Sequence, residues 1–138
     1  MTINDTPQHQ MIRRAMLRQP GAVHDVAVDL WERLAVKLIS IIGDGGFQSL
    51  YARSIHLTSI HFSWLARSVP SSTADSRFVG LKASLERCES AEASEASIAL
   101  LITFIDILTL LIGDSLTASI LRSAWGDDAL DIAEKEVR

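Results

Sequence analysis

The sequence is poor in the residues that mark several classes of protein. It has a single cysteine, Cys88, among 138 residues, so an intrachain disulfide is excluded and a structural zinc site would need histidine or carboxylate ligands. Its 3 prolines and 7 glycines are too few for a collagen-like or low-complexity chain. Its 13 Lys and Arg are outnumbered by 17 Asp and Glu, giving a net charge of −4. This balance argues against a nucleic-acid partner, which usually requires a basic stripe.

The sequence also lacks the short motifs of common active sites. No Walker A loop, GxGxxG, GxSxG or HExxH motif occurs. His56 and His61 are five residues apart, about 140° around a regular helix, so they cannot chelate one metal ion together. We therefore expect no catalytic residue, no metal and no cofactor. The first ten residues hold no apolar signal-peptide core, which together with the lone cysteine predicts a cytoplasmic protein.

Helical periodicity is the dominant pattern of the sequence. Apolar residues recur at spacings of three and four between residues 23 and 42, at positions Val23, Val26, Ala27, Leu30, Trp31, Leu34, Leu38, Ile41 and Ile42. No segment alternates with a period of two between hairpin turns. These patterns predict an all-α protein: a helical bundle of five to seven helices over residues 9–138, after a disordered tail over residues 1–8.

Glycine–aspartate pairs set the predicted boundaries of the helices. Gly43 and Gly113 each follow an apolar helical run, and the aspartate after each glycine is placed to cap the next helix. The polar stretch 89–97 is either a break between helices or the start of the next one. The resulting division is a first hairpin over 23–67, a connecting loop and helix over 68–90, a second hairpin over 91–125 and a terminal helix over 127–138.

Two segments 70 residues apart resemble each other. Residues 38–44 and 108–114 both read as an apolar helix followed by Ile-Gly-Asp. After the aspartate, the alignment drops one residue from the second copy, so that 47–54 lies against 116–123 and both copies end in Arg-Ser. This internal repeat predicts two similar helical hairpins, which close into a four-helix bundle with approximate twofold symmetry.

The segment from Ser97 to Gly113 is the most apolar of the chain. It falls short of the roughly 20 residues that span a bilayer, and Asp106 near its centre would be costly in lipid, so we do not expect a membrane location. We expect either the central helix of the bundle or an oligomer interface. One side would present Ile98, Leu101, Ile105 and Leu108, and the other Leu100, Phe104, Ile107 and Leu111. Asp106 is expected in an ion pair with Arg33, Arg53 or Arg122.

The surplus of apolar residues favours a non-enzymatic interaction or regulatory protein, such as a signalling adaptor. It would form a homodimer or bind the helix of another protein. The alternative is a small-ligand sensor, in which arginine binds a carboxylate or phosphate between the hairpins. Its candidate pocket residues are Arg53, Arg122, Asp106, Tyr51, His61 and Trp64, with His61 on the apolar face beside Trp64. An enzyme is the weakest hypothesis, because only Asp106 and His61 offer a candidate titratable pair.

Overall fold

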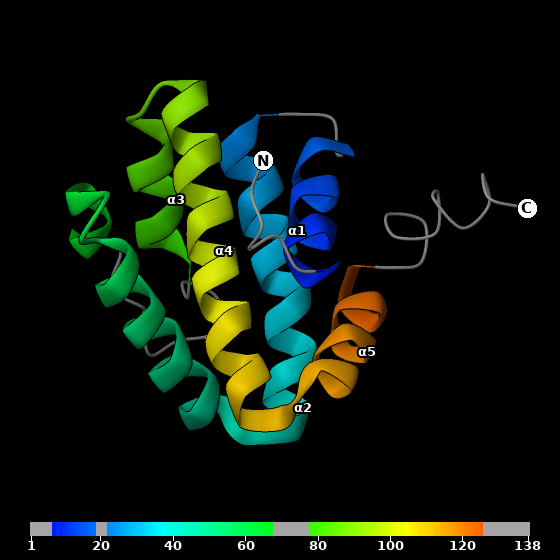
Figure 1. Cartoon of the computed structure of the whole chain (residues 1–138). Coiled ribbons are helices and arrows are strands. Elements are labelled where there is room, and N and C mark those ends of the chain that lie inside the picture. Colours follow the sequence, from blue (N-terminus) through cyan, green and yellow to red (C-terminus); the bar gives the residue numbers. More distant parts are fainter. Residues whose placement is uncertain (1–6, 19–21, 68–77, 126–138) are drawn as a thin grey trace, which may run out of the picture.

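The computed structural model describes residues 7–18, 22–67 and 78–125, and its secondary structure is helical throughout, which confirms the predicted all-α bundle. Pro7 and Gln8, which were assigned to the predicted tail, lie in the first helix. The rest of that tail, the predicted loop at 68–75 and the predicted terminal helix at 127–138 lie outside the described residues. The helices are α1 (Pro7–Arg18), α2 (Val23–Thr58), a 3-10 helix (Ser63–Arg67), α3 (Val79–Glu86), α4 (Ser90–Ile112) and α5 (Asp114–Trp125) (Figure 1).

Two glycines make the sharp corners of the fold. Gly43 has φ 86° and ψ 161°, and it divides α2 into a first arm (23–42) and a second arm (44–58). Gly113, with φ 92° and ψ 162°, makes the same corner between α4 and α5. This backbone conformation is nearly restricted to glycine, because a Cβ atom would be strained there. Both corners lie at the same end of the molecule (Figure 1).

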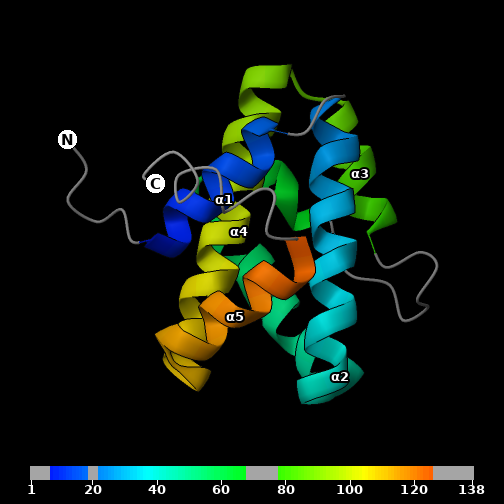
Figure 2. The same cartoon turned by 90° about the vertical axis from the view of Figure 1, so that its right-hand side faces the viewer.

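The two hairpins pack against each other and each carries one short helix. α2 contacts both α4 and α5, α1 lies on α4, and α3 lies on α2 (Figures 1 and 2). The centre of the core is a cluster of aromatic rings from both hairpins, with ring centroids 4.9–6.5 Å apart. Its members are Trp31, Phe47, Tyr51, Phe78 and Phe104.

Burial follows the same order in both hairpins at a constant offset of 70 residues. Phe47, at the start of the second arm, is 0% exposed, whereas Leu116, its partner in the sequence alignment, is 45% exposed. The buried residue at this point of α5 is Thr117. The sequence alignment, which drops one residue here, does not match this order of burial. It followed the Arg-Ser identity, whose arginines are both exposed, and packing does not constrain residue identity there.

The second arm of α2 ends earlier than the sequence predicts. The helix stops at Thr58 instead of continuing to about Arg67. The backbone then turns more tightly, with i to i+3 bonds from Ile60 N to Leu57 O and from His61 N to Thr58 O, before the short 3-10 helix. This change of pitch rotates the later residues, so the prediction that His61 faces the apolar side is wrong and its side chain is exposed.

The polar stretch 89–97 is the start of a helix and not a break. α4 begins at Ser90 and includes Glu92 in its first turn. A carboxylate at this position interacts favourably with the positive end of the helix dipole.

Candidate functional site

The structure does not gather the six residues of the sequence-predicted pocket. Arg53, Arg122 and His61 are exposed, whereas Tyr51 is fully buried in the aromatic cluster. Burial raises the pKa of Tyr51, and among the described residues no group accepts or donates a hydrogen bond to its Oη. Tyr51 is therefore part of the core and does not face a ligand.

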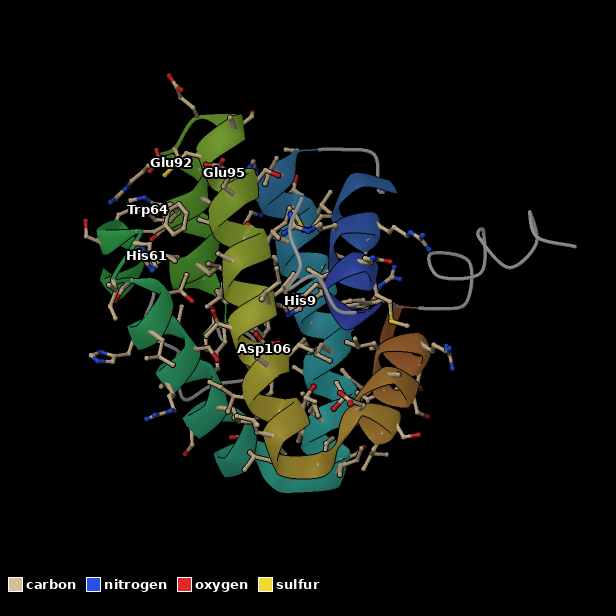
Figure 3. All side chains as sticks on the ribbon, viewed as in Figure 1. His9, His61, Trp64, Glu92, Glu95 and Asp106 are labelled. Atoms are coloured by element: carbon tan, nitrogen blue, oxygen red, sulfur yellow. The ribbon has the colours of Figure 1, made fainter. Side chains whose placement is uncertain are left out.

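Trp64 has a defined polar partner on another helix. Its Nε1 donates a hydrogen bond to Glu92 Oε2 on α4, over 3.0 Å. Figure 3 shows Trp64 close to His61 and beside the first turns of α4. The contact ties the segment after α2 to the start of α4, which assigns Trp64 a positioning role between two elements.

Asp106 is paired with a residue that the sequence analysis did not consider. His9 Nε2 on α1 lies 2.7 Å from Asp106 Oδ1 (Figure 3). The predicted partners were arginines, but Arg33 lies 3.1 Å from Asp29 on its own helix. The signal for the true partner was the 3–4 spacing of His9, Ile12 and Met16, which extends the first amphipathic helix back by one turn.

The structure places one side of α4 in the core of the chain. This helix buries Leu100, Leu101, Phe104, Ile105 and Leu108. These residues come from both of the faces that the sequence analysis assigned to partner helices, so the partners of the buried face are α2, α1 and α5 of the same chain.

The remaining side of α4 forms a second apolar stripe, which we call the outer face. It consists of Ala99, Ile102, Thr103, Asp106 and Leu110, which lie within about 100° of one another around the helix. Leu110 is 86% exposed, more than any other large hydrophobic residue of the described chain. Asp106, with its side chain 55% exposed, is the one ionisable residue of this stripe.

The first arm of α2 provides an internal comparison for this face. At the same offset of 70 residues, the positions of the outer face hold Asp29, Glu32, Arg33, Val36 and Ser40. Three of these five residues are charged, as expected for a helix face in contact with water. At this offset, the first arm of α2 therefore carries mainly charged residues where α4 carries mainly apolar ones.

A pocket lies at the N-terminal half of the outer face. It has a volume of 340 Å³ and is lined by Arg13, Phe62, Glu95, Ile98, Ala99 and Ile102. α1 supplies the arginine, the segment after α2 supplies the phenylalanine, and α4 supplies the rest. The lining is therefore mainly apolar, with one charge of each sign.

A second, smaller pocket of 210 Å³ lies where α2 and α4 begin. His24, Glu86 and Cys88 are among its lining residues, and His24 Nε2 lies 3.4 Å from Glu86 Oε2. Burial raises the pKa of the Cys88 thiol, and the charge of Glu92 raises it further. A raised pKa leaves less of the reactive thiolate and therefore opposes a role of Cys88 as a nucleophile. Within the described ranges, no group of three or more His, Cys, Asp or Glu side chains is arranged to hold a metal ion.

Neither pocket is lined by any of the six residues of the sequence-predicted pocket. Across the described part of the chain, α4 alone is long and apolar enough to cross a membrane, a property that the core helices of soluble proteins share. Comparisons of the chain with protein-family models, curated proteins and solved structures found no match. The outer face of α4 and its pocket are the surface features on which a function can be argued.

Proposed function

We propose that this protein is a non-enzymatic interaction protein that self-associates through the outer face of α4. The observation that carries this proposal is the 86% exposure of Leu110 on a stripe that also holds Ala99 and Ile102. Exposed apolar stripes of this kind mark protein interfaces, because covering them releases water from apolar surface. The charged counterpart of this stripe on α2 supports the choice of face.

We also infer that the chain consists of two similar units of three helical segments each. The first unit comprises α1 and the two arms of α2, and the second comprises α3, α4 and α5. The matching corners at Gly43 and Gly113 and the shared order of burial support this internal repeat. The short helices support it as well, because each lies on the long helix of the other unit and buries four residues at spacings of three, three and one. These sets are His9, Ile12, Ala15 and Met16 in α1, and Phe78 just before α3 with Leu81, Ser84 and Leu85 in it.

A small-ligand sensor is the second candidate function, supported by the pocket on α4. Its volume of 340 Å³ is at the lower end of the range for ligand sites, and Arg13 could bind an anionic group. The nearby carboxylate of Glu95 lowers the affinity that such a site would have for an anion. We favour self-association because it explains both the pocket and the exposed leucine.

Sedimentation velocity over a series of concentrations tests the proposal. We expect the unmodified protein to be a dimer and the Leu110→Ser variant to be monomeric. The matched control is Val36→Ser, because Val36 is 68% exposed but lies on the first arm of α2 and not on α4. The control should remain a dimer. Equal effects of the two substitutions, or a monomeric unmodified protein, would contradict a role for the outer face.

A further inference from the structure

We propose that two copies of the chain pair through antiparallel α4 helices, with Leu110 of each copy filling the pocket of the other. This inference rests on the proposed self-association and specifies its geometry. The most exposed large hydrophobic residue of the described chain and a mainly apolar pocket lie on the same helix. One chain therefore carries both the projecting group and the cavity that can receive it.

The spacing of these two features suits a twofold axis. Leu110 follows the pocket residues Ile98, Ala99 and Ile102 by eight to twelve positions, which corresponds to about 12–18 Å along the helix. A twofold axis that is perpendicular to α4, and that passes roughly midway between Leu110 and the pocket residues, brings Leu110 of one copy over the pocket of its partner. The same rotation brings the second leucine over the first pocket, so both contacts form at once, as in an isologous dimer.

Asp106 is the electrostatic cost of this arrangement, and its contact with His9 reduces that cost. It lies between Leu110 and the pocket, so the axis passes near it and the two copies of Asp106 approach each other. A bare carboxylate in an apolar interface would be costly. Each Asp106 instead enters the interface with His9 of its own chain 2.7 Å away, which can donate a hydrogen bond to it. The histidine also explains how the apolar stripe tolerates a charge.

A second copy explains these features better than an unrelated partner does. A different protein would need only one of them, either the exposed leucine or the pocket. The chain presents both on one face, at positions that a single symmetry operation brings into contact. A free helix from another protein, or a small molecule in the pocket, would leave Leu110 unexplained.

Complementary charge variants test the geometry. Leu110→Asp places a carboxylate on the projecting position, and Ile98→Lys places an ammonium group in the pocket. Each variant alone should dimerise more weakly than the unmodified protein, because its dimer would bury unpaired charges twice. In a mixture, the new carboxylate meets the new ammonium group at one contact, and the unmodified leucine enters an unmodified pocket at the other.

We expect the mixed dimer to be at least about tenfold tighter than either homodimer, as measured by native mass spectrometry of isotopically distinguished chains. The control mixture combines Leu110→Asp with Val36→Lys, which places the ammonium group on the first arm of α2, outside the lining of the pocket, and should give no such gain. Circular dichroism on each variant checks that the helices are retained. For variants that lose them, Leu110→Asn and Ile98→Gln provide uncharged replacements, and each should then weaken the dimer.

The outcomes separate the two proposals. If the unmodified protein is a dimer but the complementary mixture shows no gain over its control, the Leu110-in-pocket geometry is wrong and self-association stands. If the unmodified protein is monomeric at every concentration, both proposals fail. A stoichiometric bound mass on a monomer would instead assign the pocket to a small ligand.

Discussion

The same substitution at two buried tryptophans should change the hydrogen-bond contribution to stability in opposite directions. Trp125 Nε1 donates a 3.0 Å hydrogen bond to the carbonyl oxygen of Leu30, which joins α5 to the first arm of α2. Trp31 is equally buried, but no described residue offers its Nε1 a hydrogen-bond partner. Trp125→Phe therefore loses a bond worth about 1 kcal/mol, whereas Trp31→Phe removes an unsatisfied donor that costs about 1–3 kcal/mol in the folded state.

Replacing indole with a phenyl ring leaves a cavity in both variants, and at Trp31 it also weakens ring contacts with Tyr51 and Phe104, which offsets part of the hydrogen-bond difference. We therefore expect Trp125→Phe to lower the free energy of unfolding by about 1 kcal/mol or more beyond the effect of Trp31→Phe. Urea denaturation followed by circular dichroism at the helix band measures both values without relying on tryptophan fluorescence. If Trp31→Phe is as destabilising as Trp125→Phe, the hydrogen-bond assignment in the core is incorrect.

Three further predictions concern the docking of α1, the corners and the cysteine. A double-mutant cycle on His9→Ala and Asp106→Ala should give a coupling energy of about 1 kcal/mol, which is smaller than that of a buried pair because Asp106 is half exposed. Additive effects of the two substitutions would show that the contact is not formed. Gly43→Ala and Gly113→Ala should each lower the free energy of unfolding by about 1–3 kcal/mol in the same denaturation assay. The cause is backbone strain alone, since a Cβ atom at either position meets no atom within 4 Å, and the control Gly45→Ala should cost nothing measurable. Alkylation of Cys88 at pH 8 should be slower in the folded protein than in urea, because the raised pKa of the thiol leaves less thiolate, and Glu92→Gln should speed the reaction in the folded protein. Equal alkylation rates in the folded protein and in urea would refute this environment of the thiol.

The helical bundle and its corners could be predicted because their signals are local. The 3–4 spacing of apolar residues defines a helix wherever it occurs, and Gly43 and Gly113 occupy a backbone conformation that few other residues adopt. The first amphipathic helix, the first arm of α2 and the end of α4 at Gly113 follow the same local rules. Tertiary contacts did not need to be known for any of these elements.

The partners of polar side chains could not be predicted, because they depend on which helices lie side by side. Asp106 and His9 are 97 positions apart in the sequence, and no local pattern connects them. The same holds for the hydrogen bond from Trp64 to Glu92, which depends on the early end of α2. The location of Arg53 and Arg122 depends on the same contacts, because their residue types match in the sequence but both side chains are exposed in the structure.

The proposed internal repeat shows the same limit. Sequence identity favoured a one-residue gap after the Gly-Asp corner, whereas burial keeps a constant offset through Thr117 and Leu121. At this offset the buried Thr117 stands where the first hairpin has the buried Phe47, so residue types alone do not lead to the same alignment as burial.

Native mass spectrometry of the unmodified protein, purified without denaturation, tests the central claim most directly. The subunit count and any bound mass are read from one spectrum. The account predicts a mass of two chains with nothing added, and its loss to one chain in the Leu110→Ser variant. A single chain, with or without a bound small molecule, would contradict self-association through the outer face of α4.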